Sequence, residues 1–346
     1  MKAAFWYGRK DIRVVETDEP TPKSTEVKIA VKWCGICGSD LHEYISGPIL
    51  IPTSPHPLTG AKAPVIMGHE FSGEVVEVGS KVRKFAAGDR VTADTKYYCH
   101  TCYHCMRSDF ELCENMAFMG LASGNGAFAD YICVPEELVY DLPDQVTYEQ
   151  GAMVEPLAIG IHAVRRGFFR EGDTACVVGA GPIGLLTIQA LNAAGARRIF
   201  AIEIADNRAR LASKFGARIV DPRADPRREI FNLTDGVGVD LSFECVGKQQ
   251  SLKTCLEVVK KGGTVVVSGI FEEHPSLDFT DLVVSEKKIM GSTDGDFPAG
   301  ISLIATNRVN VDALITSRIE LSNIIDAFKQ LATSKDSVKI LVHPNT

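Results

Sequence analysis

Four cysteines crowd one short stretch of the chain, and their spacing suits a metal ion. They follow the pattern Cys-x2-Cys-x2-Cys-x7-Cys, at positions Cys99, Cys102, Cys105 and Cys113. Four thiolates on one loop can close a tetrahedral shell around zinc and leave no coordination position open, which is typical of a structural site. An iron–sulfur cluster stays open as an alternative, because cysteine runs of similar spacing bind such clusters.

A second set of metal-binding residue types is spread over three segments. Cys37 lies in the run from Cys34 to residue 42, His69 and Glu70 lie in a Gly-His-Glu triplet, and Glu155 lies in Val-Glu-Pro. A cysteine, a histidine and one carboxylate form a mixed set that is typical of a zinc ion with one position free for water or substrate. Each residue alone is weak evidence, because Glu70 could serve a salt bridge and Glu155 could end a loop. The remaining cysteines are interpreted as core residues: Cys34, Cys133, Cys176, Cys245 and Cys255.

A glycine-rich turn of the kind that binds a dinucleotide follows a predicted buried strand and opens a predicted helix. Its residues are Gly179, Ala180, Gly181, Pro182, Ile183 and Gly184. The first glycine would allow a tight turn, the second would let the backbone approach the pyrophosphate, and the third would let helix and strand pack closely. The free N–H groups and positive dipole end of the helix would face the phosphates. A glycine turn in a nucleotide-free α/β domain is the alternative.

An acidic residue bears on which nicotinamide dinucleotide would bind. Glu203 stands at the end of the next predicted strand, where its carboxylate would accept hydrogen bonds from the adenosine ribose and repel a 2′-phosphate. The sequence therefore favours NAD over NADP. Arg208 lies nearby and weakens that preference, since a guanidinium could accept a phosphate.

The elements that must position this turn alternate between short buried strands and amphipathic helices. The predicted strands are Thr174–Val178, Arg198–Glu203, Arg218–Val220, Val239–Glu244, Thr264–Ser268 and Lys287–Gly291. The predicted helices are Ile183–Ala194, Asp206–Phe215, Arg227–Leu233 and Gln249–Val259. Six strands with helical crossovers form the doubly wound parallel pattern of an α/β protein. The uncharged stretch 174–196 is accordingly interpreted as a strand and a helix rather than a membrane span.

The first part of the chain, to about residue 145, has a different pattern. Short β-branched runs are broken by Gly and Pro, which predicts an irregular antiparallel β-domain. Examples of these runs are Val27–Val31, Gly73–Val78 and Arg90–Ala93. The proline-rich segment 49–64 is predicted to be a surface loop.

Length and composition fit an ordinary globular protein of two domains. The chain has 346 residues, ten cysteines and a net charge of −7. A chain of this length is long for one compact core and commonly forms two domains. The acidic balance and the lack of a Lys/Arg block argue against nucleic acid as the partner. No signal segment is evident at the N-terminus, so we expect a cytoplasmic protein, with no membrane partner, whose cysteines bind metal or pack in the core.

Together these segments resemble the zinc-containing medium-chain dehydrogenases. The family signature reads Gly68-His69-Glu70-x2-Gly73-x5-Gly79-x2-Val82, and the resemblance covers essentially the whole chain. It implies a β-rich GroES-like catalytic domain over 1–149 and 292–346, joined to a Rossmann NAD-binding domain over 150–291. It also implies a homodimer or homotetramer.

The resemblance also implies two zinc ions per chain, one catalytic and one structural. The catalytic zinc would be held by Cys37, His69 and a glutamate, and because family members differ over which glutamate coordinates, both Glu70 and Glu155 stay open. The cysteine loop departs from the family where His100 and Ser108 stand at positions that are often Gly. Both positions lie between ligands, so we expect a reshaped loop rather than a lost metal.

The implied reaction is the oxidation of a small alcohol by NAD. Zinc would lower the pKa of the bound hydroxyl, and hydride would pass to the nicotinamide ring. Ser39 would take the proton and pass it through the cofactor ribose toward His42, whose ordinary pKa of about 6.5 suits that role. Without the resemblance, Ser39 would be interpreted as a turn residue and His42 as a surface histidine.

The substrate is predicted from segments 42–48, 56–60 and 154–158. They resemble the branch of the family that acts on (R,R)-2,3-butanediol and acetoin, so a vicinal diol is predicted. Sorbitol and threonine dehydrogenases share much of this frame and stay open as alternatives. A non-enzymatic module that binds zinc and a nucleotide is a further alternative, and Cys37, His69 and Glu155 occurring together count against it.

Overall fold

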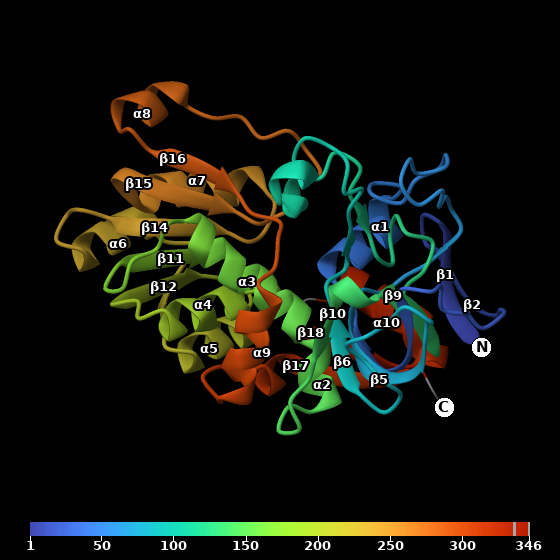
Figure 1. Ribbon diagram of the computed structural model, residues 1–346. Coiled ribbons are helices and arrows are strands. Elements are labelled where there is room, and N and C mark those ends of the chain that lie inside the picture. Colours follow the sequence, from blue (N-terminus) through green and yellow to red (C-terminus); the bar gives the residue numbers. More distant parts are fainter. Residues whose placement is uncertain (335–336, 345–346) are drawn as a thin grey trace. The chain divides into compact units, whose positions relative to one another are not determined.

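The computed structural model describes residues 1–334 and 337–344, and its backbone contacts divide the chain into two units (Figure 1). The first unit is Met1–Glu155 with Leu314–Thr346, and the second is Pro156–Ala313. The predicted α/β class, with a β-rich part and a doubly wound parallel part, is confirmed. The contacts place 292–313 in the second unit, whereas the sequence-based limits assign them to the first. Residues 335–336 and 345–346 of the predicted range 292–346 lie outside the described residues.

The second unit is built on one parallel sheet in the order β13-β12-β11-β14-β15-β16. Its strands are β11 (Thr174–Val178), β12 (Arg198–Ile202), β13 (Arg218–Val220), β14 (Val239–Glu244), β15 (Val259–Val267) and β16 (Lys288–Gly291). Its helices are α4 (Pro182–Ala193), α5 (Asp206–Lys214), α6 (Pro226–Leu233), α7 (Gln249–Val258), α8 (Phe279–Val284) and α9 (Phe297–Ala305). Helix α3 (Val154–Arg166) starts at the end of the first unit. Figure 1 shows the strands side by side with helices packed against them.

The sequence predicts this sheet well because its strands are apolar and its turns are glycine-rich. All five residues of β11 are buried, as expected for a central parallel strand covered on both faces. Strand β15 is longer than predicted because it starts at Val259, before a glycine pair that breaks the apolar pattern. The stretch considered as a membrane span is β11 followed by α4. No helix among the described residues is both long and apolar enough to cross a bilayer.

The first unit is a set of mostly antiparallel sheets. Its strands are β1 (Lys2–Gly8), β2 (Asp11–Glu16), β3 (Glu26–Gly35), β4 (Val65–Ile66), β5 (Glu70–Val78), β6 (Arg90–Ala93), β7 (Lys96–Tyr97), β8 (Ala117–Phe118), β9 (Tyr131–Pro135), β10 (Val139–Asp141), β17 (Ile315–Glu320) and β18 (Lys339–His343). Its helices are α1 (Gly38–Ser46), α2 (Tyr148–Ala152) and α10 (Ile324–Thr333). The largest sheet has the order β10-β6-β5-β3-β18-β17, with β9 also paired to β3. No helix or strand lies in 49–64, which agrees with the predicted loop.

Strand β3 is the element that brings distant parts of the first unit together. Its last residue, Gly35, pairs with Glu70 of β5 on one side and with Leu341 of β18 on the other. Strand β18 therefore lies next to the end of β3, just before the segment that contains Cys37.

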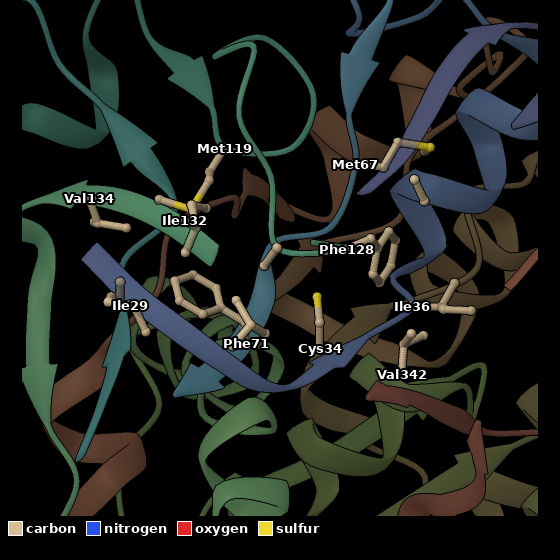
Figure 2. Packing of buried hydrophobic residues seen from close by; sticks show 14 of the residues in the cluster. Ile29, Cys34, Ile36, Met67, Phe71, Met119, Phe128, Ile132, Val134 and Val342 are labelled. Carbon is tan, nitrogen blue, oxygen red and sulfur yellow. The ribbon is translucent and has the colours of Figure 1, made fainter. Parts of the chain in front are cut away.

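The core of the first unit packs around the same strands. Figure 2 shows Cys34 among Ile36, Phe71, Phe128 and Val342, and Cys34 is fully buried. The prediction of Cys34 as a core residue is confirmed, as it is for the buried Cys133, Cys176 and Cys255. Cys245 stands in the turn after β14 and is only partly buried, although burial of its thiol raises the pKa of that group.

Candidate metal centres and dinucleotide site

The four-cysteine loop gathers its sulfur atoms into one cluster. The Sγ atoms of Cys99, Cys102, Cys105 and Cys113 all lie within 4.8 Å of one another, and those of Cys99 and Cys105 are 3.9 Å apart. Two sulfurs bound to a tetrahedral zinc by bonds of about 2.3 Å would lie roughly 3.8 Å apart. The residues present therefore fit a closed zinc site.

Backbone N–H groups point at these sulfurs, as they do around metal-bound thiolates. Cys99 donates to the Sγ of Cys113 at 3.3 Å, and Cys102 donates to the Sγ of Cys99 at 3.3 Å. Hydrogen bonds from Thr101 lower the pKa of the Cys99 thiol to about 5. Donors that stabilise a thiolate prepare the loop for a cation, because the thiolate is the form that binds metal.

Two loop residues adopt the left-handed backbone conformation that favours glycine. The φ angles are 57° at His100 and 65° at Ser108, the two positions where the family often has Gly. The side chain of His100 pairs with Glu137, its Nε2 lying 3.1 Å from Glu137 Oε1. The departures from the family pattern therefore cost backbone strain at these positions and leave the four sulfurs in place.

Substitutions at Ser108 should report that strain. Ser108→Gly should leave the melting temperature unchanged or raise it, whereas Ser108→Val should destabilise the loop by about 1–2 kcal/mol, because a β-branched residue fits poorly at positive φ. The measurement is thermal unfolding with zinc retention on the same samples. Met106→Val is the matched control, since Met106 is exposed in the same loop and has no positive φ. Equal stability of the two Ser108 variants would contradict this account.

The second candidate metal set gathers around a buried histidine in the first unit. His69 is 6% exposed, and its Nε2 lies 3.3 Å from Ser39 Oγ. Its other ring nitrogen, Nδ1, lies 3.6 Å from Asp40 Oδ1. Neither of these last two atoms has a hydrogen-bond partner in the described residues. A histidine that binds metal through one nitrogen usually directs the other at a carboxylate, so this orientation suits a ligand.

Helix α1 sets the positions of the groups beside His69. Cys37 is its N-cap, and the Cys37 backbone N–H donates to Asp40 Oδ2 at 3.0 Å. Ser39 and His42 lie three residues apart on α1, a spacing that puts side chains on one face of a helix. One short helix therefore carries a candidate ligand, the carboxylate facing the histidine, and both residues of the predicted proton relay.

The two candidate glutamates have different surroundings. Lys339 Nζ donates to both carboxylate oxygens of Glu70, at 2.7 and 2.5 Å, and to the carbonyl of Ile36 at 3.1 Å. Glu155 is also buried, and burial raises the pKa of its carboxyl to about 7, with Glu70 adding to the shift. Glu70 already has a cation, whereas the carboxylate form of Glu155 would gain from one.

The negative groups around His69 favour a cation. Burial lowers the pKa of the His69 imidazole, but Asp40, Cys37 and Glu155 outweigh that effect and hold the pKa well above its usual value. The donor set of thiol, imidazole and carboxyl fits zinc. Within the described residues, however, only the four-cysteine cluster has all its ligand atoms within 4.8 Å of one another. The ligand atoms of the second set are therefore spaced more widely.

The glycine-rich turn lies at the carboxyl end of β11 in the second unit. Gly179 has φ 92°, and Gly181 is the N-cap of α4. Pro182 is the first residue of the helix and Ile183 the second. A Cβ on Gly184 would lie 1.9 Å from the carbonyl oxygen of Gly179, so helix and strand approach too closely for any side chain there. The tight turn at Gly179 and the close helix–strand packing at Gly184 are as predicted, whereas the approach of a pyrophosphate to Gly181 stays a prediction.

The predicted ribose-binding carboxylate lies against this turn. Glu203 accepts a hydrogen bond from the backbone N–H of Ala180 at 2.7 Å, and others from Ile204 and Ala205 at 2.7 and 2.8 Å. Arg208 Nη1 lies 4.0 Å from the place that a Cβ would occupy on Gly181. The structure therefore brings the predicted carboxylate and guanidinium to the same glycine-rich turn.

Family profiles match both units of the chain. The profile described as an alcohol dehydrogenase GroES-like domain matches residues 23–144, and the one described as a zinc-binding dehydrogenase matches residues 182–306.

Full-length relatives agree with these profiles. The chain is 46% identical to the (R,R)-butanediol dehydrogenase of Bacillus subtilis, with 100% of both chains covered. The chain belongs to the zinc-containing medium-chain dehydrogenases. This dehydrogenase is also 37% identical to the (R,R)-butanediol dehydrogenase of Neisseria gonorrhoeae, again with 100% of both covered.

Solved structures of related dehydrogenases have the same fold as this one. The crystal structure of 2R,3R-butanediol dehydrogenase from Bacillus subtilis superposes with a TM-score of 0.92 at 45% identity, and 99% of each chain is covered. A zinc-binding dehydrogenase from Sinorhizobium meliloti bound to NADP has a TM-score of 0.90 at 33% identity, also with 99% of each chain covered. The protein is thus an oxidoreductase that acts on the CH–OH group of small alcohols.

Two buried residues of this dehydrogenase were missed by the sequence interpretation. Asp40 stands three residues after Cys37, and that N-cap spacing could have marked it. Lys339 lies in an apolar run in β18, and a lysine in such a run requires a buried partner. Its partner, Glu70, lies far away in sequence, so no local pattern could identify it.

Proposed function

We propose that this dehydrogenase oxidises (R,R)-2,3-butanediol and related vicinal diols with NAD, using two zinc ions per chain. The observation that carries the proposal is the 46% identity to the (R,R)-butanediol dehydrogenase of Bacillus subtilis over the full length of both chains. The fit of the thiol, imidazole and carboxyl set to zinc supports it. We also propose that the enzyme works in the cytoplasm as a homo-oligomer.

The residues proposed to hold the catalytic zinc are Cys37, His69 and Glu155. Glu70 is kept from that role by Lys339, which occupies both carboxylate oxygens. When bound, zinc supplies a Lewis acid for the alcohol oxygen, and NAD supplies the hydride acceptor. The structural zinc is assigned to Cys99, Cys102, Cys105 and Cys113.

The chain's own residues move the proton. Ser39 Oγ lies 3.3 Å from His69 Nε2, so it borders the proposed metal site and can accept the proton of the substrate hydroxyl. His42 is partly exposed on the same helix, one turn later, and can release that proton to solvent. Asp40 keeps the imidazole of His69 oriented by facing its Nδ1.

Glu203 is expected to set the preference for NAD. In Glu203→Gln the ratio of kcat/KM for NAD to that for NADP should fall about 10–100-fold, because hydrogen bonds to a charged acceptor are worth about 1.5–3 kcal/mol. Steady-state kinetics with both cofactors measures it. Glu257→Gln is the control, since Glu257 lies on α7 and not at the glycine-rich turn. An unchanged ratio would assign cofactor choice elsewhere, with Arg208 as the next candidate.

A substrate panel tests the proposal directly. Initial rates would be compared for the (R,R), (S,S) and meso isomers of 2,3-butanediol, sorbitol and threonine, each with NAD. The (R,R) isomer should give the highest kcat/KM. Strong preference for sorbitol would keep the metal and proton chemistry and discard the diol, and lack of turnover with every alcohol would discard the dehydrogenase mechanism.

A further inference from the structure

The second unit contains a cavity of about 1060 Å³ that the chemistry described so far does not use. Helices α6 and α7, the first residues of β15 and the segment 276–287 with α8 line it (Figure 1). Its lining residues all lie between 227 and 287, whereas the residues proposed to bind the dinucleotide are 179–184, Glu203 and Arg208. Small-molecule sites usually have volumes of about 300–1,000 Å³, so a small ligand fits here.

The wall of this cavity is cationic in a chain that is acidic overall. It carries five Lys or Arg side chains against three carboxylates. The cations are Arg227, Lys253, Lys260, Lys261 and Lys287, and the carboxylates are Glu257, Asp278 and Asp281. Because the whole chain has a net charge of −7, this local excess of positive charge marks a place that favours an anion.

Two of these cations have no carboxylate partner. The other three form ion pairs: Lys253 with Glu257 at 3.7 Å, Lys260 with Asp240 at 2.5 Å, and Lys287 with Asp281 at 2.9 Å. Across residues 1–334 and 337–344, no carboxylate oxygen lies within 4.0 Å of the charged nitrogens of Arg227 or Lys261. Their charge is therefore available to a ligand.

Lys287 is the buried member of this wall. Its side chain is 8% exposed, and its Nζ donates to the carbonyl of Leu256 at 2.8 Å and to Asp281 Oδ2 at 2.9 Å. A lysine ammonium has three N–H donors, and the described part of the chain provides no acceptor for the third. Because a buried donor without a partner is costly, an anionic ligand would complete the hydrogen bonding of Lys287.

Arg227, Lys261 and Lys287 come together around one carboxylate, that of Asp281. Hydrogen bonds from Lys287 and Ser285 lower the pKa of Asp281, and the charge of Arg227 adds to that shift. Gly262, the residue after Lys261, donates a backbone hydrogen bond to the carbonyl of Ser285 at 2.8 Å. Three cations thus share one carboxylate, and the group keeps an excess of positive charge.

The same cavity has an apolar side. Phe231, Val237, Leu256 and Leu277 line it, and Val237 is 55% exposed. The guanidinium of Arg227 lies over the ring of Phe231, 5.0 Å from the ring centroid. A flat apolar group placed here would bury apolar surface while a charged group attached to it meets the cations.

Helix α8 turns polar side chains toward the cavity. Asp281 and Ser285 line it, whereas Phe279 and Val283 of the same helix are 65% and 71% exposed. A helix that only closed a core would turn its apolar face inward. The orientation of α8 therefore suits a polar occupant.

We propose that this cavity binds a small organic anion whose charged group is joined to a flat apolar body. Arg227, Lys261 and the third N–H donor of Lys287 receive the charged group. Phe231, Val237 and Leu277 contact the apolar body. The site is separate from the glycine-rich turn and does not depend on the proposed use of NAD.

The test is calorimetric titration of the full-length protein with 1-naphthoate, a flat apolar ring that carries one carboxylate. Uncharged 1-naphthamide and inorganic phosphate should each bind at least about tenfold more weakly, because each lacks one half of the proposed contacts. Saturating NADH should change the Kd for 1-naphthoate by less than about twofold.

A double variant assigns the binding to this cavity. Arg227→Gln combined with Lys261→Gln should raise the Kd for 1-naphthoate about tenfold or more. Both side chains are exposed, so the fold should persist. Lys214→Gln is the matched control, since Lys214 is an exposed cation on α5 and not part of the lining; it should change the Kd by less than about twofold.

Each result decides the inference. Lack of 1-naphthoate binding up to about 1 mM, equal affinity for 1-naphthamide, or displacement of 1-naphthoate by NADH would overturn it. An unchanged Kd in the double variant, or an equal loss of affinity in Lys214→Gln, would also overturn it.

Discussion

Cys37→Ala is expected to lower kcat/KM for alcohol oxidation by about a thousandfold or more. Removing one of three protein ligands should empty the open metal site, and the Lewis acid it holds contributes several kcal/mol to the transition state, at about 1.4 kcal/mol for each tenfold in rate. The fold should persist, because Cys37 is a helix cap rather than a core residue. Steady-state rates and circular dichroism on the same preparation measure both effects.

Cys34→Ala is the matched control for that experiment. Cys34 lies three residues earlier, is fully buried and packs in the core shown in Figure 2. Its replacement should lower stability modestly and leave kcat/KM within about a factor of two, since it removes packing and no ligand. Retention of full activity in Cys37→Ala would remove this cysteine from the metal site.

Lys339→Met is expected to be the most destabilising single substitution at the site. Lys339 is 1% exposed, and its loss leaves the carboxylate of Glu70 buried without its cation. Breaking a buried pair in this way costs about 3–5 kcal/mol. The free energy of unfolding of the first unit, from urea denaturation, measures the effect.

A double-mutant cycle separates the ion pair from simple packing. The combination of Lys339→Met with Glu70→Met should recover most of the stability, since an apolar pair of similar volume can replace a buried salt bridge. Lys329→Met is the control, because Lys329 pairs with Asp326 at the surface and should change little. If the double variant is as unstable as the sum of the single ones, the buried pair does not explain the effect.

The sequence predicts the second unit closely because its signals are local. The predicted limits of β11, β13 and β14 coincide with the structure, since apolar runs bounded by Gly and charged residues mark parallel strands. The glycine-rich turn and Glu203 could be predicted in the same way, because each directly follows one of these apolar strands in the sequence. Contacts between the turns after β14 and β15, such as Gly247 against Ile270, could not be predicted, because they depend on how the two strands align.

The first unit shows where local patterns fail. Helix α1 was not predicted, because Gly38 and the mixed polar residues after it give a weak helical pattern. The ion pair of Glu70 with Lys339 joins β5 to β18 across β3, and only the register of three strands reveals it. The sequence leaves open which glutamate binds zinc, because family members differ over it, and the pairing of Glu70 with Lys339 favours Glu155.

The measurement that tests the account most directly is turnover of (R,R)-2,3-butanediol against zinc content while a chelator withdraws the metal. We expect about two zinc ions per chain at the start, with the open site emptied before the closed thiolate site. Turnover should disappear as the content falls toward one, and adding zinc should restore it. Full turnover in protein with one zinc per chain or none would contradict a catalytic zinc at Cys37, His69 and Glu155.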